Sequence, residues 1–160
     1  MRDGDPGLQE QIEAMAALKP LVGTWRGSGW TMTARGRTEF DQLERVELRL
    51  DGELLTVEGR GTAPGDVADV RFRAFAVASY DVALGGYRWR STSGGNTLEV
   101  GLDVTGPGCY SWGFEVAAAV RMRFDIRIVG ATWQEDGYLS TDDGGSWVPS
   151  MSMELARRPE

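Results

Sequence analysis

The residues with the clearest chemical potential lie on one face of a predicted strand, where two polar side chains alternate with apolar ones. Phe40, Gln42, Glu44 and Val46 share one parity, and the two-residue period of a strand points all four to the same side. The apolar members place that side in the interior. A buried carboxylate is costly unless it is bonded or paired, so Glu44 requires an inward arginine, a water or a polar group of a ligand. Two interpretations stay open: a satisfied structural pair, which we favour, and the polar anchor of an apolar pocket.

The inward positions of other predicted strands would supply an aromatic and thioether lining for such a pocket. Small residues, glycine and alanine, face these large side chains. The space left by the small residues holds either neighbouring side chains or a bound molecule, and both options stay open. Trp30 would join the lining only if the glycines around it formed a bulge that changed its face. The predicted ligand-binding set is Phe40, Gln42, Glu44, Trp89, Trp112, Phe114, Met122, Phe124, Trp133 and Met151.

Two counts exclude whole classes of catalytic and metal site. The 160 residues contain no histidine, which removes Ser-His-Asp and Cys-His catalysis and histidine-ligated metals. The single cysteine, Cys109, can form neither an intramolecular disulfide nor a thiolate metal site. A net charge of −7 argues against nucleic acid as a partner. We therefore expect no metal and no cofactor.

Beyond Pro20, short segments of alternating character separated by turn signals predict an all-β protein. Asp51-Gly52, Gly85-Gly86 and Gly94-Gly95 are hairpin signals. About ten strands joined in succession by short turns form a single antiparallel meander, and closure into a barrel avoids two exposed edges. The predicted strands are Thr24–Thr33, Thr38–Leu50, Glu53–Gly61, Asp69–Tyr80, Tyr87–Ser93, Thr97–Val104, Cys109–Val116, Val120–Val129, Thr132–Ser140 and Trp147–Arg157.

The N-terminal region differs from the rest. Residues 1–7 are polar and rich in glycine and proline, and we expect them to be disordered. Apolar residues at three- and four-residue spacing predict one short α-helix over 8–19, ended by Pro20, that covers one end of a single domain formed by residues 8–160. No apolar run is long enough to span a bilayer, and the N-terminus lacks a secretory signal. We expect a cytoplasmic protein without membrane contact.

One predicted strand is apolar on both faces. Phe75 and Val77 lie opposite the inward row of alanines, so something must cover the outside as well as the inside. The N-terminal helix or a second subunit would serve, and we favour a homodimer.

An ordered set of motifs carries a resemblance to a known superfamily. Leu21–Trp30 contains a Gly-x-Trp on the first strand, and Leu50–Thr62, Ser79–Asp81 and Asp143–Trp147 follow in order. The chain resembles an uncharacterised family of small bacterial lipocalin-like barrels of the calycin superfamily, distantly similar to nitrobindin and the fatty-acid-binding proteins. The resemblance implies a calycin-like barrel closed by Trp25, with the guanidinium of Arg157, or of its rival Arg158, over the indole. Nitrobindin-like relatives bind haem through a histidine, which this chain lacks.

These observations favour binding of a small hydrophobic molecule in the barrel interior. Two alternatives remain: a cofactor-free isomerase or cyclase that uses the cavity, with one acid to move a proton, and a filled-core homo-oligomeric module with no ligand.

Overall fold

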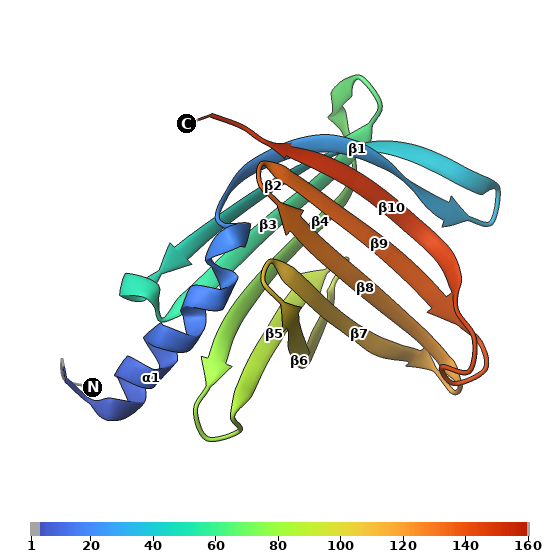
Figure 1. The fold of residues 1–160 in the computed structure, drawn as a ribbon. Helices are drawn as coiled ribbons and strands as arrows, with labels where there is room; N and C mark the ends of the chain where they lie inside the picture. The colour runs from blue at the N-terminus through green and yellow to red at the C-terminus, as the bar shows by residue number, and fades with distance from the viewer. Residues whose placement is uncertain (1–3, 160) are drawn as a thin grey trace.

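The strands form one closed antiparallel barrel, shown in Figure 1. The structure is a computed structural model, and it describes residues 4–159. Each strand pairs with its neighbours in the chain, and the first and last strands pair with each other. The ten strands are β1 Gly23–Thr33, β2 Gly36–Arg49, β3 Leu54–Ala63, β4 Asp66–Asp81, β5 Gly86–Ser93, β6 Asn96–Gly106, β7 Cys109–Ala117, β8 Val120–Val129, β9 Thr132–Ser140 and β10 Val148–Arg157. The prediction of an all-β, ten-stranded barrel is confirmed.

The barrel is closed by continuous pairing between β1 and β10, which we call the seam. Seven successive residues of β1 pair with β10, from Trp25 opposite Arg157 to Thr31 opposite Met151. The register shows no shift along either edge of β1, so Trp30 keeps the outward parity of its strand. Its ring lies under the Arg37 guanidinium, 3.7 Å from the guanidinium carbon to the ring centroid. The bulge that would turn Trp30 inward is therefore not formed.

The helical segment differs from the prediction at both ends. Helix α1 spans Pro6–Met15 and begins two residues earlier than expected, because the Asp5 carboxylate accepts hydrogen bonds from the backbone N–H groups of Gly7 and Leu8. A 3₁₀ helix, η1, continues over Ala16–Leu21 with Pro20 inside it. Proline has no N–H to donate, which is compatible with this tighter, shorter segment. Of the residues expected to be disordered, 1–3 lie outside the described part of the chain.

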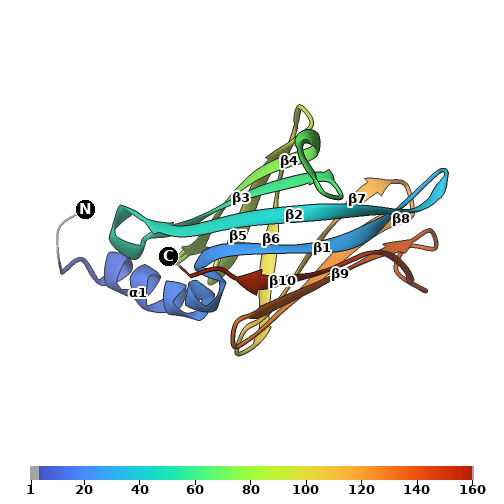
Figure 2. The same ribbon diagram turned by 90° about the horizontal axis from the view of Figure 1, so that it is seen from above.

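The helical segment covers one end of the barrel, which we call the helix end (Figure 2). The hydroxyl groups of Tyr87 and Tyr110 donate hydrogen bonds to the backbone carbonyls of Ala14 and Ala17, at 2.7 Å and 2.6 Å respectively. These bonds tie α1 and η1 to β5 and β7. Between residues 4 and 159, no helix is long and apolar enough to cross a membrane.

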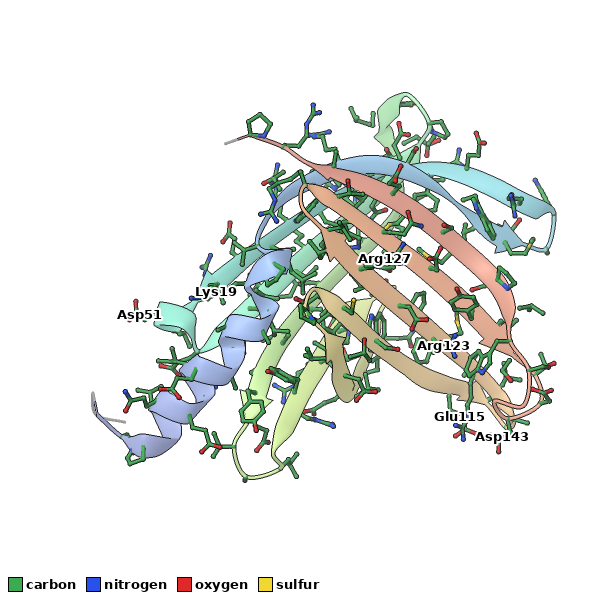
Figure 3. The ribbon with its side chains drawn as sticks, in the orientation of Figure 1. Lys19, Asp51, Glu115, Arg123, Arg127 and Asp143 are labelled. Carbon is green, nitrogen blue, oxygen red and sulfur yellow. The ribbon has the colours of Figure 1, made fainter. Side chains whose placement is uncertain are left out.

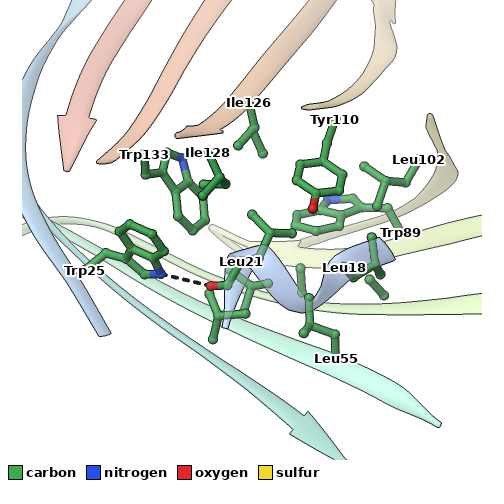
Figure 4. Packing of buried hydrophobic residues seen from close by; sticks show 14 of the residues in the cluster. Leu18, Leu21, Trp25, Leu55, Trp89, Leu102, Tyr110, Ile126, Ile128 and Trp133 are labelled. Atoms are coloured by element: carbon green, nitrogen blue, oxygen red, sulfur yellow. Dashed lines mark hydrogen bonds between the residues drawn. The ribbon is translucent and has the colours of Figure 1, made fainter. Parts of the chain in front are cut away.

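The core is concentrated at the helix end (Figure 4). Trp25 is fully buried, and its indole N–H donates to the Leu21 carbonyl at 2.9 Å. The Arg157 guanidinium lies 4.3 Å from the centroid of the Trp25 ring and donates to the Val22 and Pro20 carbonyls. Arg157, rather than Arg158, therefore occupies the position that the resemblance implied.

Charged side chains occupy the outer face of the barrel. Arg123 and Arg127 alternate along β8 with the inward apolar row, and both are labelled on the outside of the wall in Figure 3. Arg123 lies over the outward Tyr138 and Trp147 rings, each at 4.7 Å. The arginines of β8 therefore lie on the outer face of the barrel and not in its interior.

Candidate functional site

The inward-facing side chains differ in burial between the two ends of the barrel. At the helix end, Leu55, Tyr110 and Leu155 are at most 1% exposed. The opposite end, which we call the open end, carries the β1–β2, β3–β4, β5–β6, β7–β8 and β9–β10 hairpins. There, inward residues such as Phe114 and Leu139 are only partly buried. Solvent therefore reaches the interior from the open end, and the helix end is sealed.

Glu44 lies in the interior between these two regions. It is 7% exposed, and its Oε1 accepts a hydrogen bond of 2.8 Å from the Gln42 side-chain amide on the same strand. Its Oε2 is buried and has no hydrogen-bond partner. Burial raises the pKa of Glu44 from 4.5 to about 7, and the Gln42 amide opposes that rise. The paired arginine that would make Glu44 purely structural is not among its partners.

Two glycines of β3 make room for this pair of polar side chains. Gly59 pairs with Glu44, and Gly61 pairs with Gln42. A Cβ placed on Gly59 would lie 2.7 Å from Glu44 Oε1, closer than such atoms approach in proteins, and one on Gly61 would lie 3.0 Å from Gln42 Oε1. The small residues of β3 therefore accommodate the Glu44 carboxyl and the Gln42 amide.

A second interior carboxyl, Glu135 on β9, was not predicted. It has the inward parity of Trp133, whose indole N–H donates to Glu135 Oε1 at 3.2 Å. Burial, together with the charge of Glu44, raises the pKa of Glu135 from 4.5 to about 8. The charge of Glu44 contributes to this rise although β1 and β10 separate the two strands. In the register of the sheet, Trp25 of β1 lies opposite Glu44 and Met153 of β10 lies opposite Glu135, and both of these apolar side chains are buried.

The predicted aromatic residues form a connected wall. Trp112 on β7 is its centre, with ring centroids 5.3 Å from Trp89, 6.1 Å from Phe114 and 4.7 Å from Phe124. Trp89 is 6% exposed, and its indole N–H has no hydrogen-bond partner. The structure thus brings four of the predicted lining residues into one contiguous surface.

The other predicted residues divide between the two ends. Trp133 is fully buried at the helix end, where it packs edge-to-face on Trp25 at 5.5 Å. Phe40, Met122 and Met151 are partly buried toward the open end. Trp133 therefore belongs to the sealed core and donates a hydrogen bond to Glu135 of the candidate site.

The chemistry available in this interior is that of carboxyl groups in apolar surroundings. With pKa values near neutrality, Glu44 and Glu135 can donate a hydrogen bond when protonated and accept one when ionised. No group of three or more His, Cys, Asp or Glu side chains within residues 4–159 is arranged to hold a metal ion.

Comparison with known proteins identifies the fold but no family. No protein-family model matches the chain, and no curated protein matches it. The crystal structure of Rv2717c from M. tuberculosis is similar, with a TM-score of 0.65 and 17% identity over 97% of this chain and 99% of that one. The S-type phycobiliprotein lyase CPES from Guillardia theta has a TM-score of 0.60 and 10% identity over 94% and 93% of the two chains. At these identities the similarities support the barrel fold alone.

Proposed function

We propose that the protein binds a small, largely apolar molecule inside the barrel, with its polar group on Glu44. The observation that carries this proposal is the unpartnered Glu44 Oε2, buried inside a barrel whose inward aromatic residues Trp112, Phe114 and Phe124 are only partly buried. An unsatisfied buried oxygen costs about 1–3 kcal/mol, and a bound donor would remove that cost. The unpartnered Trp89 N–H supplies a second polar contact. A mostly apolar lining with a few polar groups is the usual composition of a small-molecule site.

The similarity to a phycobiliprotein lyase supports the proposal only at the level of the fold. The finer assignment to the uncharacterised lipocalin-like family stays part of the proposal and rests on the motifs from Leu21–Trp30 to Asp143–Trp147.

Binding of the neutral lipophilic dye Nile red tests the proposal. Dye fluorescence should rise on addition of the protein and saturate. Ser91 faces inward beside Ala76 and Leu98 and is only partly buried. Ser91→Trp should therefore fill the open region and weaken dye binding at least about tenfold. Thr92→Trp is the matched control, because Thr92 is exposed on the outer face of the same strand. Circular dichroism establishes that both variants are folded.

Either of two results would contradict the proposal: no saturable dye binding by the unmodified protein, or equal loss of binding in folded Ser91→Trp and Thr92→Trp variants. Native mass spectrometry of protein purified from its own host gives independent support, since a retained ligand would appear as added mass.

A further inference from the structure

We infer that the interior selects a lipophilic amine in its ammonium form, held between Glu44 and Glu135. The inference rests on the proposed function and adds the chemical class of the ligand. The two carboxyls face inward from strands on opposite sides of the β1–β10 seam, and Glu44 Oε2 is buried without a hydrogen-bond partner. An ammonium group carries three N–H donors and no acceptor, which suits a pair of carboxylates.

Within residues 4–159, no arginine or lysine forms an ion pair with Glu44 or Glu135. All the ion pairs found among residues 4–159 join arginines to Asp or Glu other than Glu44 and Glu135. The side-chain hydrogen bonds to Glu44 and Glu135 come from neutral groups, the Gln42 amide and the Trp133 indole. A bound cation would therefore be the counter-ion of Glu44 and Glu135.

Repulsion between the two carboxylates makes a cation more favourable than an anion or a neutral group. The negative charge of Glu44 disfavours ionisation of Glu135 in these buried surroundings. A single ammonium opposes both charges, whereas the carboxylate of a fatty acid would add a third negative charge to the same region. The net charge of −7 also favours the approach of cations over that of anions.

The aromatic wall fits the remainder of such a ligand. The rings of Trp112, Phe114 and Phe124 form a stacked set whose members are partly buried. Aromatic faces attract cations and pack against flat apolar groups. An amine attached directly to an aromatic or alicyclic body would place its charge at the carboxyls and its body against this wall.

Competition against Nile red with three molecules that share one ring system tests the inference: naphthylmethylamine, naphthylmethanol and naphthoate. At pH 7.5 the amine should displace the dye at a concentration at least about tenfold lower than the alcohol, the factor that one charge-assisted hydrogen bond supplies. Naphthoate should be the weakest competitor. The Glu44→Gln/Glu135→Gln double variant should still bind the dye and should lose the preference for the amine.

Gly59→Ala gives a second measurement that leaves both carboxyls in the chain. A Cβ at position 59 overlaps the Glu44 carboxyl and must displace it, whereas Gly86→Ala meets no atom within 4 Å and serves as the control. Gly59→Ala should weaken amine binding at least about threefold more than dye binding, and Gly86→Ala should change neither. Saturable dye binding with no preference for the amine would overturn this inference and leave the proposed function standing. Absence of dye binding would overturn both.

Discussion

Replacing Glu44 by glutamine should remove a large part of the pH dependence of stability. In the unfolded chain the Glu44 carboxyl ionises near pH 4.5, and in the folded barrel its pKa is about 7. Below pH 4.5 both states are protonated, so the group causes no loss of stability. As the pH rises, the unfolded state ionises first, and the free energy of unfolding falls until the folded state has ionised as well.

The size of this effect follows from the pKa difference. One pKa unit corresponds to 1.36 kcal/mol, so the rise from 4.5 to about 7 corresponds to a loss of roughly 3 kcal/mol between pH 4.5 and 8. Glutamine has nearly the same shape and does not ionise. Glu44→Gln should therefore gain roughly 3 kcal/mol relative to the unmodified protein between pH 5 and pH 9. Removal of the Glu44 charge should also lower the pKa of Glu135, which adds to the gain.

Urea denaturation at pH 5, 7 and 9 measures this difference directly. Glu39→Gln is the control, since Glu39 lies on β2 and is exposed on the outer face. It should follow the unmodified protein at all three pH values. Parallel stability curves for Glu44→Gln and the unmodified protein would refute the assignment of a raised pKa to Glu44.

Three further substitutions test the attachment of the helical segment, the contact of Arg157 with Trp25 and the packing of the interior. Tyr110→Phe removes the hydroxyl that donates to a carbonyl of η1 at 2.6 Å; it should cost about 1–2 kcal/mol in urea denaturation, because the partly buried carbonyl loses its donor. Arg157→Met removes the guanidinium over Trp25 and its two bonds to backbone carbonyls; thermal unfolding should show a loss of about 1–2 kcal/mol, and Arg158→Met should show none. Gly137→Ala places a Cβ against the facing methionine of β10 and a ring of β8; it should cost about 1–3 kcal/mol, and a variant as stable as the unmodified protein would exclude tight packing at that position.

The sequence predicted the barrel well because its signals are local. Turn residues such as Asp51-Gly52 and the alternation of apolar and polar residues each depend on a few neighbouring positions. The helical segment was less predictable. The shift of α1 to Pro6 depends on the Asp5 cap, a visible signal, but the 3₁₀ geometry of η1 depends on its contacts with the barrel end.

The candidate site was predicted in part. Parity placed Glu44 inward, and the aromatic set around Trp112 was found in the same way. Glu135 was missed although its parity matches that of Trp133, because Gln134, Glu135 and Asp136 are polar on both faces of β9 and hide the alternation. The interaction of Glu135 with Glu44 joins strands separated by two others, and no local pattern reports it.

The outer apolar residues leave one prediction open. Phe75 is 46% exposed on the outer face of β4. Helix α1 contacts β4 without covering this ring. The homodimer therefore stays a prediction, which sedimentation of the protein and of a Phe75→Glu variant would test.

The seam between β1 and β10 has a consequence for biosynthesis. Of the ten barrel strands, β1 leaves the ribosome first, and one of its edges has no partner until β10 has followed it. The contact of Trp25 with Arg157 therefore joins a residue of the first barrel strand to be made with a residue of the last. Until then the nascent sheet has two free edges, which are the surfaces on which unfinished chains can pair with each other. A ribosome that stalls before β10 would release an aggregation-prone sheet in place of a barrel.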